Sequence, residues 1–214
     1  QSVIAYTGTG VVATVPHGLG VAPILIITKS LVATQEWCVY HVEMGATKYM
    51  FLNETGQQAT SSAYWNDVEP TSVLFSIGTA GPTNSSSAMI AYCWAPKQGY
   101  SKFGTYEGNG NVEGTFVYTG FKPAFVLIKG TPGSYNWNIF DNQRPPCNPA
   151  DPPLWPNSNV GQADPYPIDL LSNGFKPRTV SSQVNSSINY IYAAFATSPL
   201  VNSSGVPTNA RSIN

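Results

Sequence analysis

The chain is poor in charged side chains, in histidine and in cysteine. Its 214 residues include 10 Lys and Arg, 11 Asp and Glu, 2 His and 3 Cys, which leaves a net charge of -1. Charged residues make up 10% of the chain, whereas an average soluble protein has about 25%. No basic surface is expected that would neutralise phosphates, which argues against nucleic acid or an anionic membrane as a partner.

Long apolar runs are also missing. The longest, at 24–27 and 88–95, have the length of a strand, and a membrane-spanning helix needs about 18 or more apolar residues. The chain is instead rich in Gly, with 19 residues, and Pro, with 18, alongside many Ser, Thr and Asn. These residues are typical of turns between short strands. The composition predicts an all-β protein and excludes a helical bundle.

Much of the first half of the sequence recurs about 100 residues later. The motif Tyr-x-Gly-x-Gly at 6–10 returns at 106–110. A Gly-x-x-Pro sequence followed by an apolar run and a lysine occupies 20–29 and again 120–129. Further matches are Trp37 with Trp137, Phe75 with Phe175 and, after one inserted residue, Asn84-Ser-Ser with Asn185-Ser-Ser.

The length of this period is that of a domain rather than of a solenoid repeat. It predicts two tandem homologous β-sandwich repeats, jelly-roll-like, of about 100 residues each. We place them at 1–98 and 99–199, followed by an extended tail at 200–214. Residues 24–27 and 124–128 are expected to form central strands because both runs are continuously apolar.

Local patterns predict further elements. Gly and Asn residues predict hairpin turns at 8–10, 108–110 and 173–174. Alternation of polar and large hydrophobic residues over 134–139 predicts a strand with one solvated face. Residues 46–65 fit strand and loop better than a helical turn or two, because Gly56 and clusters of Ser and Thr interrupt them.

The second half contains a proline-rich arm at 144–167, with eight prolines in 24 residues. Prolines favour extended backbone and remove the N–H groups that ladder pairing needs, so no pairing is expected there. The arm is either exposed to solvent or ordered against a neighbouring subunit, since prolines reduce the entropy lost on docking. The polar tail at 200–214 has no core pattern, and we expect it to need a contact to be ordered.

The residues that commonly carry catalysis are few and scattered. A triad would combine a serine with His41 and Glu36 or Glu43, but no Gly-x-Ser-x-Gly motif is present. Asp67 and Glu69 resemble a glycosidase carboxylate pair, yet exposed loop acids are the simpler interpretation. We therefore expect no enzymatic activity and no cofactor.

The sequence also lacks the residue spacings that are typical of metal-binding sites. His17 and His41 are isolated, and no His, Cys and carboxylate cluster has the spacing of a zinc site. Four aspartates could gather around calcium, but they lack the order of a calcium loop; they are Asp141, Asp151, Asp164 and Asp169. No metal is therefore expected.

The three cysteines leave at least one thiol unpaired. Cys38, Cys93 and Cys147 are expected to be free and partly buried. A bridge between Cys38 and Cys93 is the alternative, because both fall in predicted strands of one half.

Two kinds of modification or contact site remain. Four Asn-x-Ser/Thr sequences match the glycosylation acceptor pattern and begin at Asn53, Asn84, Asn185 and Asn202. Aromatic residues predicted in loops could lie in the core, in subunit interfaces or against sugars. The candidate interface or ligand contacts are Trp155, Tyr166, Trp65 and Tyr64.

An ordered set of motifs resembles a family of phage and marine-metagenome sequences. It covers about residues 3 to 211 and is carried by Tyr-Thr-Gly-Thr-Gly at 6–10, His-Gly-Leu-Gly-Val-Ala-Pro at 17–23, Thr-Ser-Ser-Ala-Tyr-Trp-Asn at 60–66, Gly-Tyr-Ser-Lys-Phe-Gly at 99–104 and Tyr-Ile-Tyr-Ala-Ala-Phe-Ala at 190–196. The family is a β-repeat domain of unknown function, often found beside concanavalin-like lectin domains in tail-fibre or virion-surface proteins. Its members are less proline-rich in the region of the arm.

The resemblance implies a non-enzymatic virion protein on a tail fibre, an appendage or the particle surface, and hence an extracellular location. It implies self-assembly and host attachment, with copies of itself, other virion proteins and host-surface glycan as partners. A lectin-like carbohydrate-binding module is the alternative. Contacts between neutral groups suit either role, because they depend little on salt.

Overall fold

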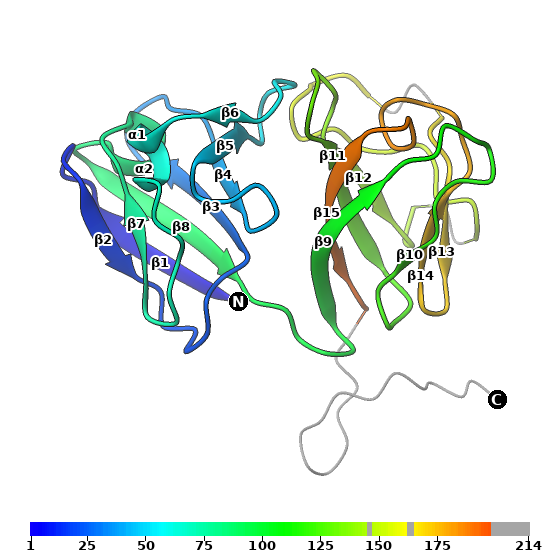
Figure 1. Cartoon of the computed structure of the whole chain (residues 1–214), viewed down its shortest axis with the longest axis horizontal. Helices are drawn as coiled ribbons and strands as arrows, with labels where there is room; N and C mark the ends of the chain where they lie inside the picture. Colours follow the sequence, from blue (N-terminus) through cyan, green and yellow to red (C-terminus); the bar gives the residue numbers. More distant parts are fainter. Residues whose placement is uncertain (145–146, 162–164, 198–214) are drawn as a thin grey trace, which may run out of the picture. The chain divides into compact units, whose positions relative to one another are not determined.

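The computed structural model describes residues 1–144, 147–161 and 165–197. It divides the chain into two compact units, Gln1–Ala95 and Pro96–Asn214 (Figure 1). Both units are mostly β, with several antiparallel sheets. No helix among the described residues is long and apolar enough to cross a membrane.

The first unit contains eight strands and two one-turn helices. In chain order they are β1 (Ser2–Thr7), β2 (Ala13–Pro16), β3 (Leu25–Ser30), β4 (Cys38–His41), β5 (Lys48–Phe51), β6 (Ala59–Thr60), α1 (Ser62–Trp65), β7 (Leu74–Ile77), α2 (Gly81–Asn84) and β8 (Ala88–Trp94). The main sheet has the order β1-β8-β3-β4-β5-β6, and β2 pairs with β7 in a second sheet. Residues 46–65 therefore form short strands, loop and one helical turn.

The core of the first unit is built from both of its sheets. Ile26 and Cys93 contribute from the main sheet, and Val15, Phe75 and Ile77 contribute from the β2–β7 sheet. The predicted strand at 24–27 is β3, which lies centrally between β8 and β4. Its apolar residues are buried, as a central strand requires.

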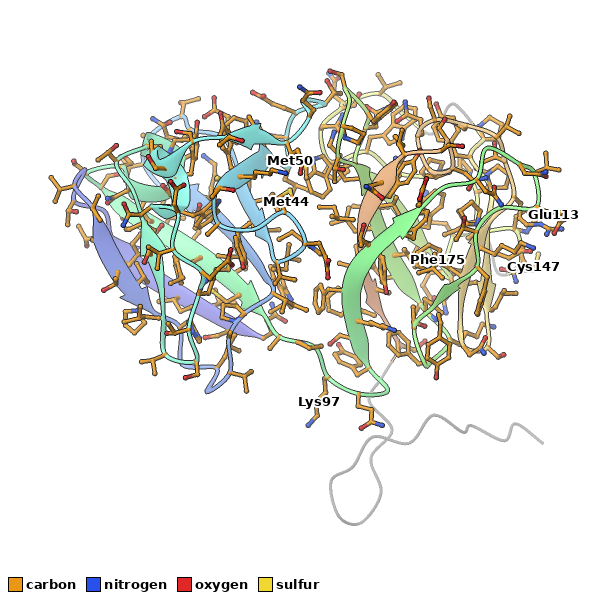
Figure 2. All side chains as sticks on the ribbon, in the orientation of Figure 1. Met44, Met50, Lys97, Glu113, Cys147 and Phe175 are labelled. Carbon is orange, nitrogen blue, oxygen red and sulfur yellow. The ribbon has the colours of Figure 1, made fainter. Side chains whose placement is uncertain are left out.

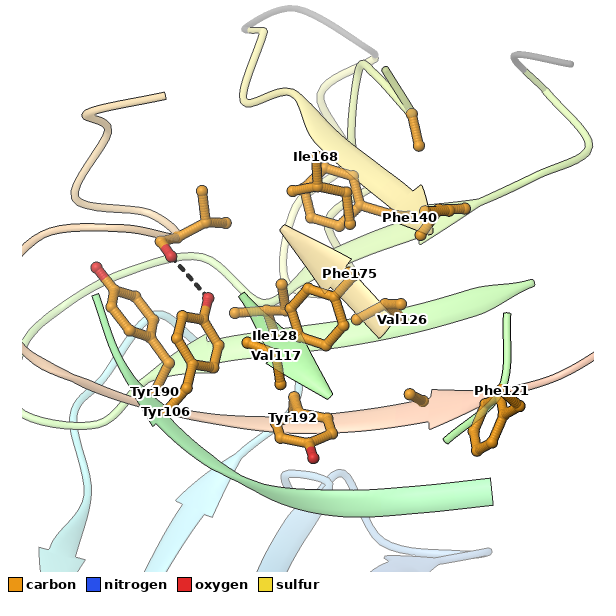
Figure 3. Close-up of a cluster of buried hydrophobic side chains, with 14 residues drawn as sticks. Tyr106, Val117, Phe121, Val126, Ile128, Phe140, Ile168, Phe175, Tyr190 and Tyr192 are labelled. Carbon is orange, nitrogen blue, oxygen red and sulfur yellow. Dashed lines mark hydrogen bonds between the residues drawn. The ribbon is translucent and has the colours of Figure 1, made fainter. Parts of the chain in front are cut away.

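The described residues of the second unit form seven strands. They are β9 (Ser101–Glu107), β10 (Val117–Tyr118), β11 (Phe125–Gly130), β12 (Asn138–Asp141), β13 (Ile168–Leu171), β14 (Gly174–Pro177) and β15 (Asn189–Phe195). One sheet has the order β12-β11-β15-β9 and the other β10-β14-β13. The predicted central strand at 124–128 is β11. The core of the second unit again receives residues from both sheets, such as Ile128, Tyr190 and Phe175 (Figure 3).

A run of four paired strands has the same order in the two units. The run β1-β8-β3-β4 of the first corresponds to β9-β15-β11-β12 of the second. The offset is not constant, however. Val15 opposes Phe75, and Val117 opposes Phe175. Aligning the second unit with the first therefore requires two extra residues before β10 and two fewer residues after it.

Two of the three predicted hairpin turns are wrong. β1 pairs with β8 while β2 pairs with β7, so 8–10 does not join two paired strands, and 108–110 likewise follows β9, which pairs with β15. Gly8 and Gly108 are required instead because another backbone segment passes very close to each of them. A Cβ on Gly8 would lie 1.8 Å from the Ser85 carbonyl oxygen, and one on Gly108 would lie 2.1 Å from that of Ser186. The turn before Gly174 does join β13 and β14.

The two repeated tryptophans precede corresponding strands, β4 and β12. In each case an asparagine Oδ1 accepts the tryptophan backbone N–H at 2.8 Å, from Asn53 for Trp37 and from Asn157 for Trp137. Trp137 is buried, whereas Trp37 is only half-buried.

The strand predicted over 134–139 begins later, at Asn138. Asn138 is also fully buried rather than solvated. Its Nδ2 donates to the carbonyl oxygens of Asn136 and Gln183. Polar contacts inside the fold therefore replace the water that the alternating pattern implied.

The described part of the proline-rich arm packs on its own unit and takes part in pairing, contrary to expectation. Leu154 and Ile139 exchange both backbone hydrogen bonds, at 2.8 and 2.9 Å, and Ala150 bridges to Ile168. Ala150 is buried, whereas Cys147 is exposed (Figure 2). The prolines flank these pairing positions, so the N–H groups that they lack are not needed there. The tail at 200–214 lies outside the described residues.

A buried asparagine holds the loop after β1 in place. Asn84 is 1% exposed. Its Oδ1 accepts the backbone N–H groups of Thr9, at 2.7 Å, and Gly10, at 3.2 Å. Its Nδ2 donates to the carbonyl oxygens of Val11 and Gly78, both at 2.6 Å. One amide thus satisfies four backbone groups from two separate loops.

The second unit has the same arrangement around Asn185. This residue is 0% exposed, and its Oδ1 accepts the Asn109 N–H at 3.2 Å. Its Nδ2 donates to the carbonyl oxygens of Asn111 and Thr179, both at 2.7 Å. We call Asn84 and Asn185 the asparagine clamps. Because both are buried and fully bonded, neither serves as a glycosylation acceptor in the folded unit.

A tyrosine accompanies each clamp, and Tyr6 is half-buried whereas Tyr106 is buried. The Tyr6 hydroxyl donates to the carbonyl oxygen of Thr83, and the Tyr106 hydroxyl donates to that of Val184 at 2.6 Å (Figure 3). Both bonds reach the residue just before the clamp. The first strand of each unit is thereby tied to the segment that enters β8 or β15.

Asn84→Ala should lower the free energy of unfolding by at least about 2 kcal/mol, because it leaves several buried backbone groups unpaired. Calorimetry of the full chain measures this loss. Asn53→Ala is the matched control, since Asn53 is exposed and caps only the Trp37 N–H. Equal losses for the two variants would contradict the clamp.

Trp137→Ala should lower the free energy of unfolding by about 3 to 5 kcal/mol, as expected for removal of a buried tryptophan. Trp37→Ala is the control at the corresponding position and should cost clearly less, because Trp37 is half-buried. Urea unfolding followed by circular dichroism gives both values. A larger loss for Trp37→Ala would overturn the assignment of burial.

Candidate functional site

Both histidine rings form hydrogen bonds with backbone groups. His17 Nε2 donates to the Thr71 carbonyl oxygen at 3.0 Å, and its Nδ1 accepts the Leu19 N–H at 3.2 Å. His41 Nδ1 accepts the Glu43 N–H at 3.2 Å. Both rings are about 1% exposed. The Nδ1 of a triad histidine donates to a carboxylate, whereas the Nδ1 of His41 accepts a backbone hydrogen bond, so the ring is not arranged as the triad that we considered requires.

The carboxylates Asp67 and Glu69 are not a pair. Glu69 accepts the Tyr40 hydroxyl through Oε2 and the Ala46 N–H, at 2.7 Å, through Oε1. Burial, followed by the hydrogen bond to Glu69, raises the pKa of Tyr40 above its usual value. Asp67 is exposed and follows Asn66 in the left-handed backbone region, with φ of 53° and 55°. Glu69 therefore anchors a loop to the core.

The aspartates considered for calcium are held by other groups. Asp141 forms an ion pair with Arg144 at 2.6 Å, and Asp169 lies 3.4 Å from the Arg178 guanidinium. The Asp151 carboxylate accepts the Tyr166 N–H, and Asp164 lies outside the described residues. Within the described ranges no three His, Cys, Asp or Glu residues gather closely enough to hold a metal ion.

Cys38 and Cys93 are buried free thiols and Cys147 is exposed. Cys38 opposes Thr28 and Cys93 opposes Ile26, on opposite sides of β3. Two strand spacings of about 4.8 Å separate them, and a disulfide tolerates at most about 7 Å between Cα atoms. The geometry therefore rules out the alternative Cys38–Cys93 bridge. Burial raises the pKa of the Cys93 thiol to about 12.

Trp65 is a core residue, which selects the first of the alternatives left open for the loop aromatics and removes Trp65 from the candidate interface or ligand contacts. It ends α1 and is 2% exposed. Its ring meets those of Tyr40 and Phe75 edge-on, with centroids 5.8 and 6.4 Å away. The Ser61 cap and the one-turn helix direct the indole inward, a feature that the run of Ser and Thr residues did not reveal.

Tyr64, the residue before it, lies in a cluster of half-buried aromatic rings. Its ring stacks on Tyr49, with centroids 3.6 Å apart and planes 16° apart, and Phe51 lies 5.8 Å away. We call Tyr49, Phe51 and Tyr64 the ring cluster. It borders the exposed polar loop 53–57, so it combines apolar faces with nearby hydrogen-bonding groups.

Trp155 and Tyr166 lie together in the second unit, with ring centroids 6.3 Å apart. Both are half-buried. The Trp155 Nε1–H donates to Asn138 Oδ1 at 3.0 Å, and Tyr166 packs against the core cluster. The structure thus brings these two candidates together within one unit, and each retains some exposed surface. It places the other two candidates in the first unit.

A repeated lysine was not recognised as a functional position from the sequence. Lys29 Nζ donates to the Gln35 carbonyl oxygen at 2.8 Å, and Lys129 Nζ donates to that of Tyr135. Each amine closes the loop that follows its strand. Burial lowers the pKa of Lys129 to about 8. The signal was present in the sequence, because both lysines end the repeated apolar run.

One family model matches the chain, over residues 1–199, with the description "Domain of unknown function (DUF7483)". No curated protein and no solved structure matches the chain. Since the match spans far more than half of the sequence, the chain belongs to the DUF7483 family, a domain of unknown function.

Proposed function

We propose that the chain is a non-enzymatic structural component of a phage particle, displayed on a tail fibre, an appendage or the particle surface. In this role it assembles with copies of itself and with other virion proteins and contacts the host surface outside the cell. The phage setting is supported by the motif resemblance described above. The structural role is supported by what the polar side chains of both units do.

The observation that carries the proposal is that reactive and polar groups are engaged in holding backbone. Both nitrogens of His17, the Oε1 of Glu69 and both asparagine clamps bind loop N–H or carbonyl groups, and the Oε2 of Glu69 accepts the Tyr40 hydroxyl. Such networks fix loops rigidly when every member is satisfied. Rigid loops between strands are a property that a particle-surface protein requires.

The corresponding strand orders support a finer description of the fold. We propose two homologous β-sandwich repeats of jelly-roll type, joined in tandem. The clamps support common descent, because Asn84 and Asn185 make matching bonds to matching loops. Duplication would give one chain two similar rigid modules, which suits a protein that builds repetitive surfaces.

Two measurements on the purified chain and the native particle test this function. Antibodies to the chain, labelled with gold, should decorate the particle surface or its appendages in electron micrographs. Incubation with host polysaccharide or peptidoglycan should release no reducing ends above a heat-denatured sample. Steady release of reducing ends, or undecorated particles, would contradict the structural role.

A lectin-like carbohydrate-binding module is the second candidate, and the ring cluster favours it. Sugars present C–H faces that stack on aromatic rings, while their hydroxyls bond to amides and hydroxyls nearby. Tyr49, Phe51 and Tyr64 supply such rings beside loop 53–57. Trp155 with Tyr166 is a smaller alternative in the second unit.

Tyr64→Ala should weaken binding to any glycan found on an array by about tenfold, because loss of a stacking ring is worth about 1 to 2 kcal/mol. Tyr118→Ala is the control, since Tyr118 is 56% exposed and lies outside the ring cluster. Trp155→Ala tests the second unit in the same way. No glycan binding by the parent chain, or equal loss in all three variants, would contradict the lectin role.

A further inference from the structure

The strand β1 forms an open edge of the main sheet in the first unit. It pairs with β8 on one side and is the terminal strand in the order β1-β8-β3-β4-β5-β6 (Figure 1). Its sequence, Ser-Val-Ile-Ala-Tyr-Thr, has no charge, no proline and no glycine. Natural sheets usually protect an edge with charged residues, prolines, bulges or a covering segment. None of these occurs within β1.

The direction of the backbone groups along this edge follows from the register. Gly8 N–H donates to the Ser87 carbonyl oxygen at 2.9 Å, and the ladder continues this pair through Tyr6–Met89 and Ile4–Ala91. In an antiparallel pair, residues that face the partner alternate with residues that face away. The N–H and C=O groups of Val3, Ala5 and Thr7 therefore point away from β8.

Those outward groups have no partner among the residues that the structure describes. No hydrogen bond joins the backbone of Val3, Ala5 or Thr7 to any other described segment. Their side chains are exposed as well, with Val3 at 54%. A strand that arrives at this edge would meet three unpaired backbone positions and three neutral side chains.

The corresponding strand of the second unit is protected. β9 carries Lys102 and Glu107, and the segment around β10 binds across its edge. Lys102 Nζ donates to the Tyr118 carbonyl oxygen at 2.9 Å, and the Thr115 hydroxyl donates to that of Glu107 at 2.7 Å. The same position in the two units is thus shielded in one and open in the other.

We propose that β1 is an assembly edge, which pairs antiparallel with β1 of a second copy of this chain. The inference rests on the self-assembly in the proposed function and names the surface that performs it. A two-fold axis at Ala5 places it opposite the partner's Ala5 and places Val3 opposite the partner's Thr7. Every outward N–H then meets an outward C=O, because the three residues are symmetric about Ala5.

The side chains fit this partner. Two alanines meet at the axis, where they leave room, and the β-branched Val3 and Thr7 form favourable cross-strand pairs. No like charges are brought together, because β1 is uncharged. The same strand is thus complementary to itself in both backbone and side chains, so a second copy is the occupant that the edge fits.

Disulfide trapping tests the register directly. Ala5→Cys combined with Cys147→Ser should form a covalent dimer under mild oxidation, because paired residues at the axis have Cα atoms about 5.5 Å apart, within the range of a disulfide. Thr105→Cys combined with Cys147→Ser is the matched control on β9. We expect at least about tenfold more dimer from the Ala5 variant on non-reducing gels, and equal yields would overturn the proposal.

Ala5→Pro gives a second measurement. The N–H that it removes points away from β8, so the variant keeps the β1–β8 ladder and should retain the parent's circular dichroism spectrum. Its assembled fraction in sedimentation should fall sharply. If the parent and Ala5→Pro assemble equally, the proposal that β1 is the assembly edge is contradicted, while the proposal that the chain self-assembles is retained. If the parent stays monomeric at every concentration, both proposals fail.

Discussion

The asparagine clamp is the interaction on which each unit depends. The loop after the first strand crosses from one sheet to the other, and its backbone groups would otherwise lie unpaired beside a buried segment. Asn84 and Asn185 satisfy those groups from within the core. The close approach of this loop then requires Gly8 and Gly108, because a Cβ would overlap the backbone next to the clamp. The tyrosine that precedes each glycine completes the connection.

This constraint explains how a chain with 10% charged residues builds rigid loops. The loops are fixed by amide, hydroxyl and imidazole bonds to backbone, which are only weakly sensitive to salt. The ion pairs that Glu113 forms with Lys176 and Arg178 contribute little, since Glu113 is exposed (Figure 2) and solvent screens exposed pairs. The same engaged polar groups are the observation on which the proposed structural role rests.

The sequence predicted the parts of the fold that depend on apolar runs. The central strands β3 and β11 were found because burial of both faces requires continuous apolar residues. The role of the glycines at 8–10 was misjudged, because Gly-x-Gly serves a hairpin and a close approach equally well. The pairing of Leu154 was missed because proline content describes a segment as a whole, while one residue between prolines is enough to form a bridge. For the site, Trp65 and Tyr64 are adjacent in sequence but differ in burial, because the one-turn helix α1 places Trp65 in the core and leaves Tyr64 half-buried at its border.

Hydrogen exchange of individual amides measures the central claim most directly. Thr9 and Asn109 are exposed loop residues, and their N–H groups are held by Asn84 and Asn185. If the clamps organise the units, nuclear magnetic resonance should show both amides exchanging as slowly as those of neighbouring strands. Exchange at the rate of an unprotected loop at either position would contradict the account.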